Sequence, residues 1–274
     1  MVTSPVRANP AEMPALNQKL LVISFDAFRY QYLQDNHRFL PWLNQFRSEG
    51  VYSDQMESIF PSETFPNHWS IATGMYAENH GIVSNYMYDP SLNETFSKSN
   101  VDFKWWGEAE PIWISARKQS IKTAISFWPG SAVEFPDGLR PDYWSFYDES
   151  VRFETRINET IDHLAYDDVR LAMLYYNQPD ETGHKFGVPS NYVDAQLQLV
   201  DWYLSFLFMK LDQVGLGKDK LNIIICADHG MVNKTDTFIL NKYLDTDEYI
   251  ERVNYWKILI FEIFPLFRYP TMGL

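Results

Sequence analysis

The chain has 274 residues, of which 46% are hydrophobic and 16% aromatic, enough to bury a sizeable core in one large domain or two small ones. Its formal net charge of -13 argues against binding of nucleic-acid polymers or anionic membranes, and is compatible with bound divalent cations. Its one cysteine, Cys226, excludes a disulfide within the chain.

In chain order, apolar runs alternate with segments of helical spacing. Strands are predicted at Leu20–Phe25, Lys122–Trp128, Arg170–Tyr176 and Leu221–Ala227, and helices at Phe39–Glu49, Phe65–Thr73, Pro111–Gln119, Arg152–Leu164 and Tyr192–Val214. This alternation predicts an α/β fold with a mostly parallel central sheet flanked by helices.

The two ends of the chain carry little pattern. Residues 1–19 are predicted to form a flexible leader, because they lack the apolar core of a signal peptide. No stretch reaches the roughly 18–20 apolar residues of a membrane span, so the apolar segment 255–267 is expected to be a buried or incidental segment rather than an anchor. N-glycosylation sequons at Asn93, Asn158 and Asn233 nevertheless suggest a secreted glycoprotein.

Aspartates follow three of the predicted strands, two of them with a histidine nearby. They are Asp26, Asp180 with His184, and Asp228 with His229. A single aspartate after a strand usually caps a turn or a helix. Ligands of open α/β sheets gather at the carboxyl ends of strands, however, and five carboxylate and imidazole groups there suit two metal ions. The glycine between Asp180 and His184 is interpreted as allowing a tight loop.

The stretch 60-FPSETFPNHWSIATG-74 places Thr64 just before a predicted helix. One interpretation is turn chemistry and helix capping. The other is a nucleophile beside a metal centre, with N–H groups of the helix start offered to a phosphoryl oxygen. His37, His80 and His163 have no such context and are interpreted as surface or packing residues.

Several motifs together identify a family resemblance. They are 24-SFDAFR-29, 61-PSETFPNHWSIATGMYAENHGIVSNYMYDP-90, 110-EPIW-113, 127-FWPGS-131, 178-QPDETGHKFG-187 and 227-ADHGM-231. With them the chain resembles the nucleotide pyrophosphatase/phosphodiesterase family of the alkaline phosphatase superfamily. The resemblance runs from about Leu20 to about Ile250, so residues 20–250 are predicted as a partial catalytic domain and 251–274 as a divergent tail.

The resemblance implies a role for each matching residue. Thr64 would be the nucleophile, and Asn85 would donate to a phosphate oxygen in the transition state. Phe65 and Tyr147 would sandwich a nucleotide base; the alternative is that they only pack in the core. Asn67 and His68 would support the loop. One Zn²⁺ ion would be held by Asp26, Thr64, Asp228 and His229, and a second by Asp180, His184 and a further histidine.

The chain departs from the family pattern at its end. No histidine follows His229, so the second zinc site lacks one ligand, and the chain looks truncated with an incomplete sheet. The predicted function is zinc-dependent hydrolysis of nucleotide pyrophosphate or phosphodiester bonds, releasing nucleoside 5′-monophosphates through a threonine-linked intermediate. The alternatives are a lysophospholipid or choline phosphodiesterase and an inactive family member. The resemblance implies an extracellular or membrane-anchored location and a small phosphodiester substrate.

Overall fold

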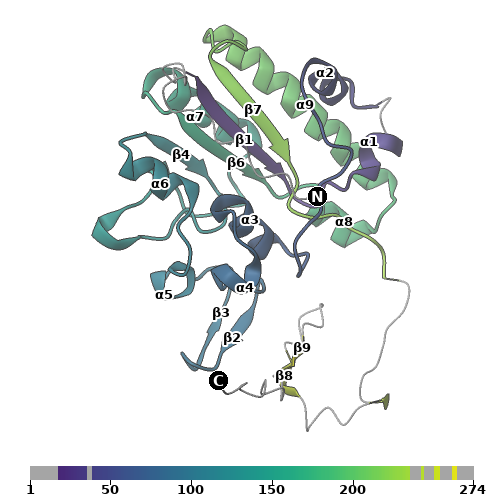
Figure 1. Cartoon of the computed structure of the whole chain (residues 1–274). Coiled ribbons are helices and arrows are strands. Elements are labelled where there is room, and N and C mark those ends of the chain that lie inside the picture. The colour runs from purple at the N-terminus through teal and green to yellow at the C-terminus, as the bar shows by residue number, and fades with distance from the viewer. Residues whose placement is uncertain (1–17, 36–38, 235–241, 244–249, 254–260, 264–274) are drawn as a thin grey trace, which may run out of the picture.

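The computed structural model describes residues 18–35, 39–234, 242–243, 250–253 and 261–263. Its centre is a five-stranded sheet in the order β5-β4-β6-β1-β7, in which every neighbouring pair of strands is parallel (Figure 1). The strands are β1 (Lys19–Phe25), β4 (Thr123–Ser126), β5 (Tyr143–Trp144), β6 (Leu171–Tyr176) and β7 (Leu221–Cys226). The predicted α/β fold with a parallel central sheet is confirmed.

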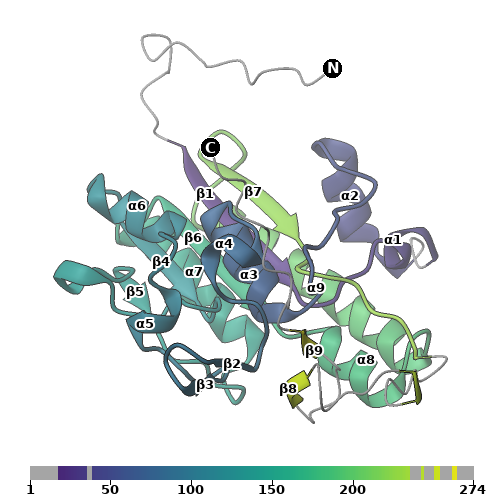
Figure 2. The same cartoon turned by 60° about the horizontal axis from the view of Figure 1, so that its bottom comes forward.

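Helices cover both faces of this sheet (Figures 1 and 2). On one face, Leu21 and Ile23 of β1 pack in a core with α7 (Phe153–Tyr166) and α9 (Asn191–Gln213). Val22, which alternates with them, faces a second core that is rich in tryptophan. That core includes residues of α3 (Thr64–Thr73), α5 (Phe103–Trp106) and α6 (Ile112–Lys118).

The remaining elements lie around this frame. The helices are α1 (Gln31–Asp35), α2 (Pro41–Glu49), α4 (Ala77–His80), α8 (Asp180–Phe186) and the 3₁₀ helix η3 (Pro136–Gly138). Two antiparallel pairs complete the list: β2 (Met87–Asp89) with β3 (Glu94–Phe96), and β8 (Ile250–Val253) with β9 (Phe261–Ile263). No helix in the described residues is long and apolar enough to cross a membrane.

Two local predictions were wrong. The strand predicted at Lys122–Trp128 is shorter, because Phe127 takes a positive φ of 60° and turns the chain away from the sheet. The tight loop predicted at Asp180–His184 is the helix α8. A Cβ on Gly183 would lie 2.3 Å from the Met231 sulfur, so this glycine allows close packing of the helix against the loop after β7.

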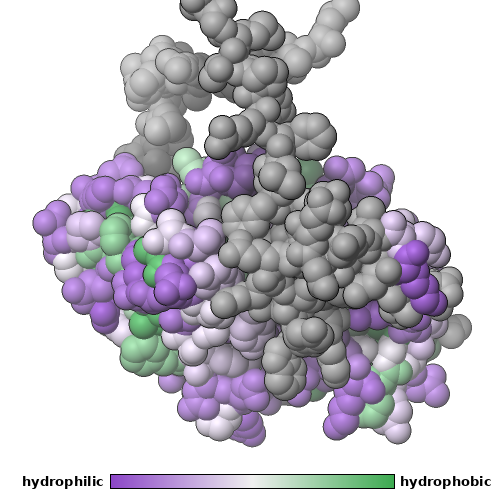
Figure 3. Space-filling model, turned by 90° about the horizontal axis from the view of Figure 1, so that it is seen from below, coloured by the Kyte–Doolittle hydropathy of each residue, from purple (hydrophilic) through white to green (hydrophobic). Residues whose placement is uncertain are grey.

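Most of the predicted leader 1–19 and tail 251–274 lies outside the described residues, as do segment 255–267 for the most part and His37. The face at the carboxyl ends of the strands is seen from below in Figure 3, where the visible described surface is mainly hydrophilic, with small hydrophobic groups between. The functional candidates follow the strands at this end of the sheet.

Candidate active site

Three predicted metal ligands converge at the ends of two neighbouring strands. Asp26 follows β1, and Asp228 and His229 follow β7, which pairs with β1. His229 Nε2 lies 3.4 Å from Asp26 Oδ1 and 3.4 Å from Asp228 Oδ2. The ligand atoms of these three side chains all lie within 4.8 Å of one another. Strand pairing therefore brings residues about 200 positions apart into one cluster.

The hydrogen bond on the far side of His229 sets how its ring faces the carboxylates. Its Nδ1 is 2.8 Å from the carbonyl oxygen of Gly230, which can only accept, so Nδ1 carries the proton. In the neutral ring, Nε2 then directs a lone pair at two carboxylate oxygens. Without a cation these lone pairs repel one another, whereas a bound cation could accept all of them.

The two carboxylates are deeply buried. Asp26 Oδ1 and Asp228 Oδ2 have no hydrogen-bond partner among the described residues. Burial, followed by the charges of Asp228 and Asp180, holds the pKa of Asp26 well above its usual range. Burial also acts to raise the pKa of Asp228, but the positive charges of His68 and His229 when these rings are protonated, together with hydrogen bonds from His68 and the Ala27 N–H, outweigh it and lower that pKa to about 2. The cluster thus fits a divalent cation by its donor types and by its unpartnered oxygens.

Asp180 and His184 form a second pair on α8. Their spacing of four residues puts them on one helix face, with His184 Nε2 3.3 Å from Asp180 Oδ1. Asp180 Oδ1 is buried without a hydrogen-bond partner in the described structure, whereas the His184 side chain is 66% exposed. The Asp180 N–H donates to the Asp26 carbonyl oxygen at 3.1 Å, which ties α8 to the end of β1.

Thr64 is the first residue of α3 and points at the cluster. Its Oγ1 is 3.4 Å from Asp26 Oδ2 and 3.5 Å from His229 Nε2. The expectation that the helix start offers several N–H groups to a ligand was wrong. Phe65 N–H already donates to Asn85 Oδ1 at 2.8 Å, and Pro66 has no N–H, so only the Thr64 N–H remains in the first three positions.

Asn85 is brought to the same helix start by that hydrogen bond. Because its side-chain oxygen accepts from Phe65, its NH₂ group is left to donate to another acceptor. The amide lies beside the residue that follows Thr64 in the chain. Asn85 and Thr64 are thus held together although they are 21 positions apart in the sequence.

A pocket of about 610 Å³ joins most of these groups. Its lining includes Asp26, Thr64, Asp180 and His184 together with the aromatic residues Phe65 and Tyr147. Phe65 also packs on Phe96 and Trp106 with ring centroids 6.1 and 5.9 Å apart, while Tyr147 is 46% exposed. Tyr147 packs on Phe127 and Tyr175 with ring centroids 5.4 and 6.3 Å apart, so both aromatic residues combine packing contacts with a surface open to the pocket.

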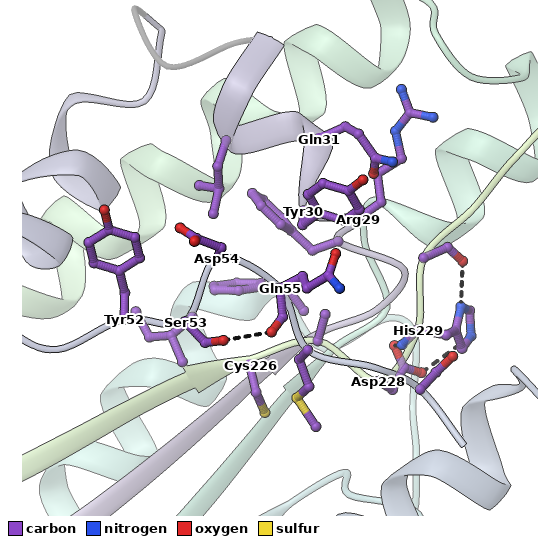
Figure 4. A pocket seen from close by; sticks show the side chains of 18 of the residues that line it. Arg29, Tyr30, Gln31, Tyr52, Ser53, Asp54, Gln55, Cys226, Asp228 and His229 are labelled. Carbon is purple, nitrogen blue, oxygen red and sulfur yellow. Dashed lines mark hydrogen bonds and ion pairs between the residues drawn. The ribbon is translucent and has the colours of Figure 1, made fainter. Parts of the chain in front are cut away.

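Asp228 and His229 also border a second hollow, of about 1030 Å³ (Figure 4). It is lined by residues 51–58, by residues around Arg29 and by the outer edge of β7. Cys226 belongs to this lining, and burial raises the pKa of its thiol to about 12. The Cys226 side chain also packs against the tryptophan-rich core.

Two residues of α3, Asn67 and His68, support the loop before Thr64 and the cluster. Asn67 donates to the carbonyl oxygens of Pro61 and Glu63, and accepts from Ile59 N–H, as its expected loop-supporting role requires. His68 Nδ1 is 2.8 Å from Thr64 O and 3.3 Å from Asp228 Oδ2, and its Nε2 is 2.9 Å from Ser24 Oγ. Among the other histidines, His80 is buried as a packing residue.

Sequence reasoning missed Tyr175. Tyr175 belongs to the neighbouring strand β6, and its hydroxyl donates a hydrogen bond of 2.6 Å to Asp26 Oδ2. Burial, followed by the Asp26 charge, raises the pKa of the Tyr175 hydroxyl well above its usual range. In the sequence it is one of two tyrosines ending an apolar run, with nothing to mark which faces Asp26. Its position follows only from the register that pairs Ser24 with Tyr175.

The model of the type I phosphodiesterase/nucleotide pyrophosphatase family matches residues 20–268. The chain belongs to this family. Like other members, it has the alkaline-phosphatase-like α/β fold. The match includes part of the tail predicted from 251, and the boundary near 250 stays a prediction.

Named relatives and solved structures agree with this membership. Rat ectonucleotide pyrophosphatase/phosphodiesterase family member 1 is 39% identical over 244 residues, covering 87% of this chain and 26% of the relative. Human bis(5′-adenosyl)-triphosphatase ENPP4 is 40% identical over 232 residues, covering 83% and 50%. An inactive variant of murine ectonucleotide pyrophosphatase/phosphodiesterase 5 in complex with AMP has a TM-score of 0.77 at 38% identity, covering 85% and 63%. This family member thus spans between about a quarter and two thirds of these relatives.

Proposed function

We propose that this chain is a zinc-dependent hydrolase of nucleotide pyrophosphate and phosphodiester bonds, acting through a threonine-linked intermediate. The observation that supports the proposal is one pocket whose lining includes Thr64, the aromatic residues Phe65 and Tyr147, and Asp26, which belongs to the cation-suited cluster within reach of the Thr64 hydroxyl. A related protein is inactive as a threonine-to-alanine variant and binds AMP in that form. Another relative is named for cleavage of bis(5′-adenosyl) triphosphate.

Two groups of residues would hold the metal. Asp26, Asp228 and His229, with the Thr64 hydroxyl, form the first; Asp180 and His184 form the second, which has one protein ligand fewer than catalytic zinc usually has. When bound, zinc supplies positive charge that lowers the pKa of a hydroxyl and stabilises charge on phosphate oxygens. The unpartnered oxygens of Asp26, Asp180 and Asp228 support both sites.

The residues of the chain divide the chemistry between them. The Thr64 oxygen attacks phosphorus, which forms a threonine–phosphorus ester and breaks the bond to the leaving group. Asp26 Oδ2, 3.4 Å from Thr64 Oγ1, is an acceptor within reach of the threonine proton. Water then cleaves the ester, restoring the Thr64 hydroxyl and releasing a nucleoside 5′-monophosphate.

Asn85 and the aromatic walls would orient the substrate. The Asn85 NH₂ group, left over by the bond to Phe65 N–H, would donate to a non-bridging phosphate oxygen. Phe65 and Tyr147 would contact the two faces of the base. In keeping with the names of the relatives, we also propose an extracellular or membrane-anchored setting for the whole protein.

A lysophospholipid or choline phosphodiester is the second candidate, and the exposed aromatic surface of Tyr147 also suits a choline cation. The test is a substrate panel on the zinc-loaded and the chelator-treated chain: a chromogenic thymidine 5′-phosphodiester, a chromogenic phosphorylcholine ester and a phosphomonoester. We expect zinc-dependent cleavage of the thymidine ester with kcat/KM at least tenfold above the others. Preference for the phosphorylcholine ester would transfer the proposal to lipids, and cleavage of none would make the chain an inactive family member.

A further inference from the structure

Glu63, the residue before Thr64, is a buried carboxylate with 6% of its surface exposed. Its Oε2 accepts two hydrogen bonds from one loop, from the Asn85 backbone N–H at 2.7 Å and from the Ser84 hydroxyl at 3.2 Å. The side chain does not cap its own helix α3. It is committed instead to the loop that carries Asn85.

Asn85 returns a hydrogen bond to the same helix start. Its side-chain Oδ1 accepts from Phe65 N–H at 2.8 Å. Residues 63–65 and 84–85 are therefore joined by two reciprocal connections, one from the Glu63 side chain to the Asn85 backbone and one from the Phe65 backbone to the Asn85 side chain. Thr64 stands between the two points of attachment.

The backbone of Glu63 is fixed from the opposite side. Asn67 donates to the Glu63 carbonyl oxygen through Nδ2 at 2.8 Å and through its backbone N–H at 3.2 Å. A negative charge at this position also interacts favourably with the N-terminus of α3. Glu63 is thus held by its helix and in turn holds the loop.

We infer that Glu63 is a positioning residue, which sets the Asn85 amide relative to the Thr64 hydroxyl. The inference rests on the proposed function of Thr64 and Asn85. Glu63 itself does not line the substrate pocket, so its loss should leave ground-state binding largely unchanged and affect the transition state, where the Asn85 amide is expected to act.

The expected results separate positioning from general stability. Glu63→Ala should lower kcat by about 10–100-fold, as expected for a misplaced catalytic group, with KM changed less than about threefold. Glu63→Gln keeps an oxygen that can accept both hydrogen bonds and should recover most of kcat. Asp102→Ala removes another acidic residue at a helix start, the cap that accepts from Lys104 N–H on α5, and should leave kcat unchanged.

The deciding experiment is a double-mutant cycle of Glu63→Ala with Asn85→Ala, measured as kcat on a chromogenic nucleotide ester beside thermal melts. If Glu63 acts through Asn85, its substitution should lower kcat by less than about twofold in the Asn85→Ala background. Multiplying effects, or an unchanged kcat for Glu63→Ala, would overturn the inference while leaving the proposed function in place. A zinc-loaded wild type that cleaves no nucleotide ester would overturn both. Should Glu63→Ala fail to fold, Glu63→Asp, shorter by one methylene group, takes its place in the cycle.

Discussion

Replacing Asp26 by asparagine will stabilise the metal-free protein and remove its stabilisation by zinc. In the wild type, Asp26 Oδ1 is buried without a hydrogen-bond partner in the described structure and faces the His229 Nε2 lone pair at 3.4 Å. An amide there can donate NH₂ to His229 and keep its oxygen for the Tyr175 hydroxyl, which now bonds Oδ2 at 2.6 Å. Removing one unsatisfied buried acceptor is worth about 1–3 kcal/mol in the free energy of unfolding.

The assay is thermal unfolding with and without zinc. For a chain of this size, about 1–3 kcal/mol corresponds to a rise in Tm of roughly 2–5 °C in chelator. In the wild type, zinc at about 100 times its Kd adds about 2.7 kcal/mol. In the Asp26→Asn variant this increment should fall below about 1 kcal/mol, because a ligand charge is lost.

Asp201→Asn is the matched control. This aspartate is also buried, at 3% exposure, but both of its oxygens are satisfied, by Leu43 N–H at 2.8 Å and Trp42 N–H at 3.2 Å. An asparagine can accept only one of these, so Asp201→Asn should lower the free energy of unfolding by about 1–3 kcal/mol and leave the zinc increment unchanged.

The sign of the pH dependence gives a further check. The pKa of Asp26 is raised in the folded state, so the folded metal-free protein binds more protons than the unfolded chain once pH exceeds the ordinary carboxyl value. The contribution of Asp26 to the free energy of unfolding therefore falls as pH rises from about 4. The gain in free energy of unfolding in Asp26→Asn over the wild type should grow over the same range. A metal-free Asp26→Asn variant less stable than the wild type, or a full zinc increment in the variant, would show that Asp26 Oδ1 is neither an unsatisfied acceptor nor a zinc ligand.

Two further predictions concern the frame of the site. Gly130→Ala should lower the free energy of unfolding by about 2–5 kcal/mol, because φ is +85° and a Cβ would lie 2.5 Å from the Trp69 ring. The control is Gly138→Ala, where φ is +70° but the space around the glycine is open; this variant should lose only about 1 kcal/mol. Urea titration measures both losses. Burial lowers the pKa of His80 to about 4, so its contribution to stability is complete above about pH 6.5 and should fall by up to about 1.4 kcal/mol per pH unit between 6.5 and 4. Urea titrations of wild type minus His80→Gln isolate that slope.

Equal losses for the two glycine variants would show that the tryptophan ring yields to the added methyl group, against the close packing described for this core. A wild-type and His80→Gln difference that does not change between pH 7.5 and 4.5 would show that this buried imidazole does not resist protonation.

The sequence predicted four of the five strands of the central sheet, because these four are apolar runs. Of them, β1 and β6 are buried along most of their length, whereas β7 lies at the edge of the sheet with Ile224 half exposed. Leu20–Phe25 and Leu221–Ala227 match β1 and β7 to within one residue at each end. The aspartates after these strands could be placed at one site, since the carboxyl ends of parallel strands meet. The geometry brings together Asp26, Asp228 and His229 as that reasoning expects.

What depends on packing could not be predicted. The glycine at 183 suggested a loop, whereas its role is contact with Met231, a residue of another element. Tyr175 and Glu63 act through partners set by strand register and by the fold of the 84–85 loop, which no local pattern encodes. The freedom of the N–H groups at the start of α3 was overestimated, because the Asn85 side chain occupies one of them.

The most direct test of the central claim is hydrolysis of a chromogenic thymidine 5′-phosphodiester by zinc-loaded protein, comparing wild type with Thr64→Ala and Thr64→Ser. We expect turnover that disappears with chelator, falls at least about a thousandfold in Thr64→Ala, and is retained in part by Thr64→Ser, which keeps the hydroxyl. Folding of all three would be checked by thermal melts. A folded Thr64→Ala variant within tenfold of wild type, or a folded, zinc-loaded wild type without turnover, would contradict the central claim.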